Sequence, residues 1–116
     1  MSKIFINEAK KAEIDRAAAL RAADEWFAAE IAAGYTANVN DSNITLGLTD
    51  SDVTLLTGNF LLAKEADAMN LPIPAVIDAA GGSHNLTLAD LTTVMLGYGQ
   101  HRAELSAEYA RRKSEV

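Results

Sequence analysis

The sequence of 116 residues contains no cysteine, so neither a disulfide framework nor a thiolate site is possible. Aromatic residues make up only 6% of the chain and proline occurs twice. Hydrophobic residues reach 49%, but much of that share is alanine, which buries little area. We therefore expect one domain, residues 1–116, with a thin core. Contacts with partners would supplement the stability of this core.

Basic residues are scarce, with 10 Lys and Arg against 16 Asp and Glu and a formal net charge of −6. Between Ala22 and His101 the only basic residue is Lys64. This balance argues against nucleic acid as a partner. The basic run at residues 111–113 complements the dipole of a closing helix or, alternatively, contacts the acidic middle of a neighbouring molecule head to tail.

Long apolar runs are also missing. No stretch approaches the roughly 18 consecutive apolar residues of a membrane span, and the run at residues 3–6 is too short for a signal peptide. We therefore expect no membrane partner. Residues 1–6 have a β-like pattern, which predicts either a terminus folded back on its own domain or a docking strand added to the edge of a partner's sheet.

The first half of the chain predicts a helix at 7–34 and a hairpin at 35–48. Asn7 is a suitable N-cap, and Gly34 is a suitable residue to follow the helix. Trp26 lies on an alanine-rich face, where it either anchors the protein's own core or contacts a partner. The hairpin is indicated by alternating apolar residues on both sides of the polar cluster at 40–43.

The second half predicts a helix at 49–70, a hairpin at 73–86 and a long helix at 87–114. Gly58 within the second helix costs about 1 kcal/mol relative to alanine, which suggests a close helix crossing. Gly81-Gly82 fits a tight two-residue hairpin turn. Thr87, three residues before Asp90, resembles a capping box. The last helix carries an apolar stripe that skips one turn at Arg102 and consists of Leu88, Leu91, Met95, Tyr98, Leu105 and Tyr109.

These elements together predict a mostly helical α+β fold. We expect three long helices in an antiparallel bundle, accompanied by two small β-hairpins. The expected order is helix, hairpin, helix, hairpin, helix.

Arrangements that carry chemistry are hard to find in this sequence. No Gly-x-Ser-x-Gly elbow accompanies the serines. His84 and His101 lack metal-ligand spacing with each other or with a nearby acidic motif. Gly81-Gly82 has neither the Walker lysine nor the dinucleotide glycine spacing. We therefore expect no catalytic, cofactor-binding or metal-binding residues, and a protein that is not an enzyme.

A family resemblance extends this interpretation. It rests on Ile31-Ala32-Ala33-Gly34-Tyr35 before a hairpin, Thr49-Asp50-Ser51-Asp52 opening a helix, Val76-Ile77-Asp78 with the glycine turn, and His84-Asn85-Leu86-Thr87 before the long helix through Leu91. This order, from Glu30 to the end of the chain, resembles a small domain of unknown function found in tailed-phage tail-fibre and host-specificity proteins and in their short companion proteins. The resemblance implies a virion or virion-assembly component and brings no catalytic residues.

From the resemblance we expect a non-enzymatic structural protein of a tailed bacteriophage, associated with the tail or tail fibre. It would be made in the host bacterial cytoplasm, reside in the virion tail, contact other tail or fibre proteins and form a homo-oligomer within the assembly. A tail-fibre assembly chaperone or adaptor and a capsid cement or decoration protein are the alternatives. Because large aromatic residues carry much of the energy at interfaces, the candidate contact residues are Phe5, Trp26, Tyr35, Tyr98 and Tyr109.

Overall fold

The computed structural model describes the backbone of residues 2–116 and the side chains of residues 8–116. It confirms a mostly helical α+β fold with three helices and two antiparallel hairpins. In chain order the elements are α1 (Ser2–Ala33), β1 (Tyr35–Val39), β2 (Ser42–Leu46), α2 (Asp50–Ala68), β3 (Val76–Ile77), β4 (Ser83–His84) and α3 (Leu88–Ser114).

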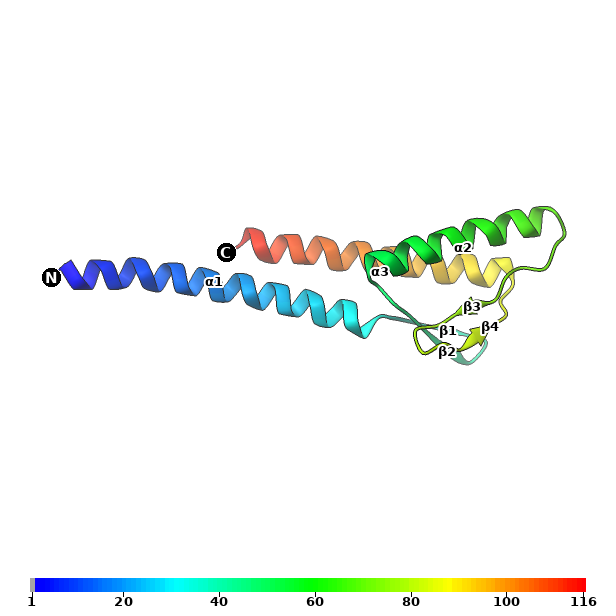
Figure 1. Ribbon diagram of the computed structural model, residues 1–116, viewed down its shortest axis with the longest axis horizontal. Helices are drawn as coiled ribbons and strands as arrows, with labels where there is room; N and C mark the ends of the chain where they lie inside the picture. The colour runs from blue at the N-terminus through cyan, green and yellow to red at the C-terminus, as the bar shows by residue number, and fades with distance from the viewer. Residues whose placement is uncertain (1) are drawn as a thin grey trace.

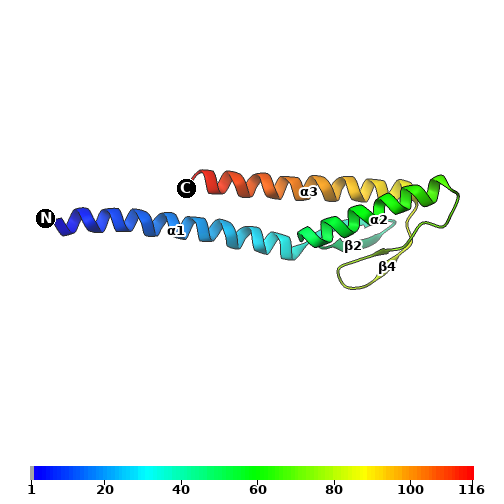
Figure 2. The same cartoon turned by 45° about the horizontal axis from the view of Figure 1, so that its top comes forward.

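The molecule is elongated, with principal extents of 78 × 23 × 19 Å. Both α1 and α2 run antiparallel to α3, but they lie along different halves of it (Figures 1 and 2). α2 packs on the N-terminal half of α3 and α1 on the C-terminal half, while the N-terminal part of α1 extends past the end of α3. The expected bundle of all three helices is therefore not confirmed: the helices form two successive pairs that share α3.

The first hairpin explains this arrangement, because it takes the place beside α2 and α3 that a third helix would occupy. In the hairpin Tyr35 pairs with Leu46, and the alternation of the strands directs Ile44 and Leu46 into the core. Their neighbours in the buried cluster include Leu91 and Tyr98 of α3. The core thus lies at the end of the molecule where the hairpin, α2 and α3 meet.

Residues 3–6 are helical, which corrects the strand expected there, and α1 begins at Ser2 rather than at the predicted N-cap Asn7. Their β-branched and aromatic residues favour extended structure only weakly. Once the helix is nucleated, each added residue gains a backbone hydrogen bond, so the alanine-rich sequence that follows extends its helix through them. The side chain of Phe5 lies outside the described residues.

The expected helix boundaries at Thr49, Thr87 and Gly34 are confirmed. Thr49 and Asp52 form a full capping box, with the Asp52 amide donating to the Thr49 hydroxyl at 3.1 Å. The Thr87 hydroxyl accepts from the Asp90 amide at the same distance. Gly34 follows α1 with φ +76°, a left-handed conformation that favours glycine.

The second hairpin turn differs from expectation. Ile77 pairs with Ser83, so residues 78–82 form a five-residue turn in place of a two-residue Gly-Gly turn. Asp78 organises it, because one carboxylate oxygen accepts from the amides of Ala80 at 3.0 Å and Gly82 at 2.7 Å. The other oxygen lies 2.7 Å from Nε2 of His84. The role of this carboxylate was not predicted from the sequence. Its hydrogen bonds stabilise the turn, in place of the positive φ that was expected at the second glycine.

Candidate protein–protein interface

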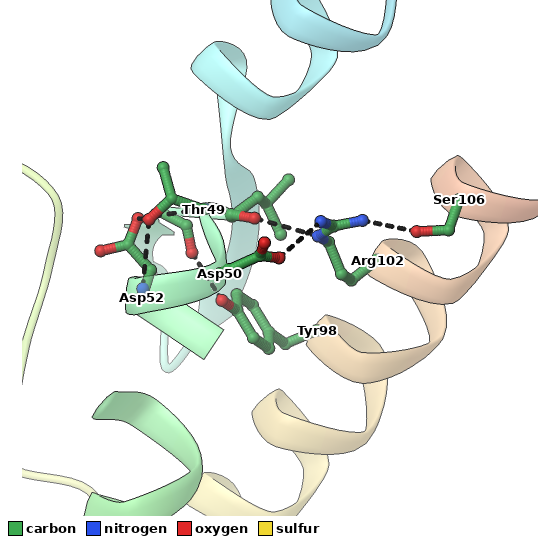
Figure 3. A network of polar contacts seen from close by, with 8 residues as sticks. Thr49, Asp50, Asp52, Tyr98, Arg102 and Ser106 are labelled. Carbon is green, nitrogen blue, oxygen red and sulfur yellow. Dashed lines mark hydrogen bonds and ion pairs between the residues drawn. The ribbon is translucent and has the colours of Figure 1, made fainter. Parts of the chain in front are cut away.

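A polar network joins α3 to the segment that enters α2 (Figure 3). The Tyr98 hydroxyl donates to the Gly47 carbonyl at 2.6 Å, and Nε of Arg102 donates to the Leu48 carbonyl at 3.0 Å. The Arg102 guanidinium also donates to Asp50 at 3.2 Å and to Ser106 at 2.5 Å. These bonds fix the start of α2 against α3, so the two helices present one rigid surface.

Tyr98 is the buried centre of this network. Its side chain is only 2% exposed. Burial raises the pKa of its hydroxyl, and the nearby Asp52 carboxylate acts in the same direction. The hydroxyl therefore stays protonated and donates its hydrogen bond across the ordinary pH range.

Arg102 accounts for the turn that the apolar stripe of α3 skips. Its guanidinium is held by a carbonyl and a carboxylate, and it also lies 5.2 Å from the centre of the Phe27 ring. An arginine covers apolar surface with its stem while its head remains hydrogen-bonded. The polar residue within the stripe is thus part of the packing at the junction of α1, α2 and α3.

An open apolar groove of ≈ 500 Å³ runs between α2 and α3 on the surface fixed by this network. Its walls include Val53 and Phe60 of α2 and Met95 and Leu96 of α3, while Asp50, Arg102 and Ser106 lie at its polar end. Leu96 remains 68% exposed. A groove with apolar walls and one polar end is suited to a protein segment or an apolar ligand.

A second apolar surface covers the side of α2 that faces away from α3. We define the outer face of α2 as the residues within about 60° of Gly58 on a helix of 100° per residue, namely Ser51, Thr54, Leu55, Gly58, Leu61, Leu62, Glu65 and Met69. Its four large apolar side chains are exposed to 57–67%. Single exposed apolar residues are common, but four on one side of one helix form a patch of the kind that marks interaction sites.

The five candidate contact residues do not form a common surface. Tyr98 lies in the core, and Phe5 lies outside the described side chains. Tyr35 packs edge-on against Tyr98, with ring centres 6.1 Å apart. Trp26 and Tyr109 lie in the seam between α1 and α3 and are half-buried.

The seam between α1 and α3 is built from aromatic and charged pairs. The Tyr109 ring stacks on Phe27 at 4.3 Å, and its hydroxyl contacts the Asp24 carboxylate. The Arg112 guanidinium lies 4.0 Å from the centre of the Trp26 ring. These aromatic side chains therefore hold the chain's own helices together, and a partner role for Trp26, Tyr35 or Tyr109 stays a prediction.

The basic residues at the end of α3 also have partners within the chain. Glu108 accepts from Arg111 at 2.6 Å and from Arg112 at 3.0 Å, and Arg111 also contacts Glu115 at 2.6 Å. The hydrogen bonds from Arg111 and then Arg112 lower the pKa of Glu108 to about 2. Much of the basic run is thus matched locally by acidic residues, in addition to its favourable place at the helix C-terminus.

Within residues 8–116, no cluster of three or more His, Asp or Glu side chains is arranged to hold a metal ion. Asp78 and His84 form a close pair, and the hydrogen bond from His84 is the main cause that lowers the pKa of Asp78. This pair closes a hairpin turn. Of the helices described, none is both long enough and apolar enough to cross a membrane.

The apolar outer face of α2 was not among the predicted contact residues, although a signal for it is present. Apolar residues occur on every side of this helix: Leu56 and Ala63 toward the core, Val53 and Phe60 toward the groove, and Leu62 with its neighbours outward. A helix that is hydrophobic all round is normally buried on all sides. Here one side remains open in the single chain.

Comparison of the chain with protein-family models, with curated proteins and with solved structures gives no match.

Proposed function

We propose that this chain is a non-enzymatic structural protein of a tailed bacteriophage, associated with the tail or tail fibre, that acts through contacts with other virion proteins and with copies of itself. The proposal combines the resemblance of residues 30–116 with the surface properties of the single chain. The main observation in favour of the contact role is the large surface area that the chain leaves uncovered.

The shape of the chain measures this uncovered surface. Its radius of gyration is 20.7 Å, whereas a compact domain of the same length has about 13 Å. Its accessible surface is 7967 Å² for 12.4 kDa, whereas a monomeric protein of that mass exposes roughly 6,100 Å². The excess of roughly 1,800 Å² is about twice what one partner buries in a standard interface.

The free part of α1 contributes to this excess. Residues 8–19 are exposed, and this part of the helix extends past the end of α3 (Figure 2). An isolated helix of this length is marginal in water, because most helical stability in proteins comes from packing. We infer that helices of neighbouring subunits cover it in the assembly and there complete the antiparallel bundle that the sequence predicts.

The test is mass spectrometry of purified virions of the source phage, fractionated into heads and tails. The proposal expects the chain in the tail fraction at a fixed ratio to known tail proteins. Recovery with the heads would favour a capsid cement protein. Absence from particles despite expression in infected cells would favour a tail-fibre chaperone or adaptor.

A further inference from the structure

The outer face of α2 has a glycine at its centre that the single chain does not require. Gly58 lies near the middle of α2, and a Cβ added there meets nothing within 4 Å. Its φ is not in the left-handed region. A glycine inside a helix costs about 1 kcal/mol relative to alanine, and no contact within the described structure compensates this cost.

The surroundings of Gly58 indicate what approaches it. Leu55 precedes it by one helical turn, and Leu61 and Leu62 follow it by one turn, all on the same side and all more than half exposed. Large apolar residues on either side of a glycine form a shallow saddle, which lets another helix approach closely at its centre. The occupant that fits this saddle is thus an apolar helix with a small residue at the crossing point.

We propose that this occupant is α2 of a second copy, bound antiparallel across a two-fold axis that passes through Gly58. A two-fold interface uses the same patch on both subunits, so the patch must be complementary to itself. With the two Gly58 residues facing each other across the axis, Leu62 of one copy meets Leu55 of the other, because both lie on the same flank of the crossing. Leu61 meets Thr54, whose methyl group is apolar. Every large side chain within one turn of the crossing therefore has an apolar counterpart.

Charge selects the antiparallel direction. Glu65 is the only charged residue of the outer face. In a parallel pair the two Glu65 carboxylates would face each other, whereas in the antiparallel pair they lie roughly 20 Å apart along the helices, well beyond the screening length of about 8 Å.

The antiparallel pair also gives Glu65 a favourable neighbour, because it places the carboxylate beside Ser51 at the N-terminus of the other α2, where the helix dipole favours negative charge. The two acidic residues that flank Ser51 are directed elsewhere: Asp50 pairs with Arg102, and Asp52 bonds to Thr49. The antiparallel direction therefore separates the two Glu65 carboxylates and places each one at the positive end of a helix dipole.

The outer face supplies the apolar centre of such a dimer. A standard interface buries about 800 Å² per partner, and the four large apolar side chains of the outer face are exposed to 57–67%. Ile77, 55% exposed, shares a hollow with Leu55 beside the outer face and extends the apolar surface toward the second hairpin. The dimer rests on the proposed function in one respect, because both require that the chain acts by associating with other protein molecules.

Two matched substitutions test the interface. Gly58→Lys places a long charged side chain on the proposed axis, while Gly99→Lys places the same side chain at another helix glycine whose Cβ would also meet nothing within 4 Å. Both variants are expected to fold, as measured by far-UV circular dichroism. In sedimentation equilibrium we expect the parent and Gly99→Lys to dimerise alike, and Gly58→Lys to raise the dimer Kd by at least about tenfold.

The register is tested by engineered disulfides, which are unambiguous because the chain has no cysteine of its own. An equimolar mixture of Leu55→Cys and Leu62→Cys is oxidised and analysed by mass spectrometry. The proposal expects the mixed disulfide to exceed both homodisulfides, since residues 55 and 62 oppose each other across the axis. A mixture of Leu55→Cys and Ser42→Cys, the latter at an exposed position of the first hairpin, should give no such preference.

Three outcomes would overturn the proposal. These are a parent protein that stays monomeric at a concentration of about 0.5 mM, a dimer weakened equally by both lysine variants, and the absence of a preferred 55–62 disulfide. Any of these together with the chain in purified tails would reject the α2 dimer and leave the structural role in place. A confirmed dimer that is absent from virions would do the reverse.

Discussion

Replacing Gly97 by alanine is expected to destabilise the protein relative to the same replacement at Gly99, two residues further along α3. A Cβ added at Gly97 meets the hydroxyl oxygen of Tyr35 and lies 3.2 Å from the ring carbon that bears it. The Tyr35 ring is held between Tyr98 at 6.1 Å and His101 at 5.4 Å. A Cβ added at Gly99 meets nothing within 4 Å.

The magnitude follows from two opposing effects. Alanine is better than glycine inside a helix by about 1 kcal/mol, and this gain applies at both positions. At Gly97 the extra methyl group also forces Tyr35 to move, and overpacking of this kind costs about 1–3 kcal/mol. The two variants should therefore differ in unfolding free energy by about 1–3 kcal/mol, with Gly99→Ala the more stable. For a chain of this length that difference is about 4–12 °C in Tm.

The assay is thermal and urea unfolding followed by far-UV circular dichroism at one fixed protein concentration, because self-association would add to apparent stability. Tyr35→Phe supplies the control, since it removes the hydroxyl that the new methyl group would meet. In the double-mutant cycle, Gly97→Ala should be less harmful when residue 35 is phenylalanine. Equal Tm shifts for Gly97→Ala and Gly99→Ala, or additivity in the cycle, would refute the reasoning.

Three further predictions concern the core, the network and the end of α3. Leu91 is only 4% exposed, so Leu91→Asp should lower the unfolding free energy, measured with urea, by about 3–5 kcal/mol. The control Ala89→Asp, in the exposed first turn of the same helix, should not lower it by that amount. Equal stability of the two variants would reject the burial of Leu91. Tyr98→Phe should cost about 1–3 kcal/mol by leaving the Gly47 carbonyl without its donor, and Tyr109→Phe should cost less, as compared by urea unfolding. Because Arg111 and Arg112 lower the Glu108 pKa from 4.5 to about 2, their stabilisation should be complete above pH 4.5 and lost as the pH falls toward 2. A carboxyl-carbon NMR titration of Glu108 with a midpoint near 4.5 would contradict this.

Local signals in the sequence were reliable where both partners lie within one helical turn. Thr87 with Asp90 begins α3 as the capping pattern predicts. The start of α2 was expected at Thr49, where the structure adds a capping box with Asp52. Gly34 ends α1 in the left-handed conformation. The position of the turn at residues 78–82 was predicted correctly, but its length and geometry were not. The Asp78 carboxylate makes three hydrogen bonds there that the spacing of the glycines does not reveal.

Partners distant in sequence could not be predicted in the same way. Residues 3–6 follow the helix that succeeds them rather than their own β preference. The aromatic residues were selected as contact candidates because of their large side chains. The periodic pattern did not assign Tyr98 to the core, nor did it assign Trp26 and Tyr109 to the seam between α1 and α3. Those assignments depend on which helix lies alongside α3 at each point. The first hairpin determines this, because it occupies the space next to α2.

The sequence by itself therefore determined the helices and hairpins, the N-caps of α2 and α3 and the apolar character of α2, because hydrogen bonding within a turn and side-chain periodicity are local properties. Only the tertiary structure decided which sides of α2 are covered. Leu56 faces the core and Phe60 the groove, while Leu55, Leu61 and Leu62 remain in solvent around Gly58. The physical reason is that a helix with apolar residues on all sides has no preferred orientation until its neighbours are in place.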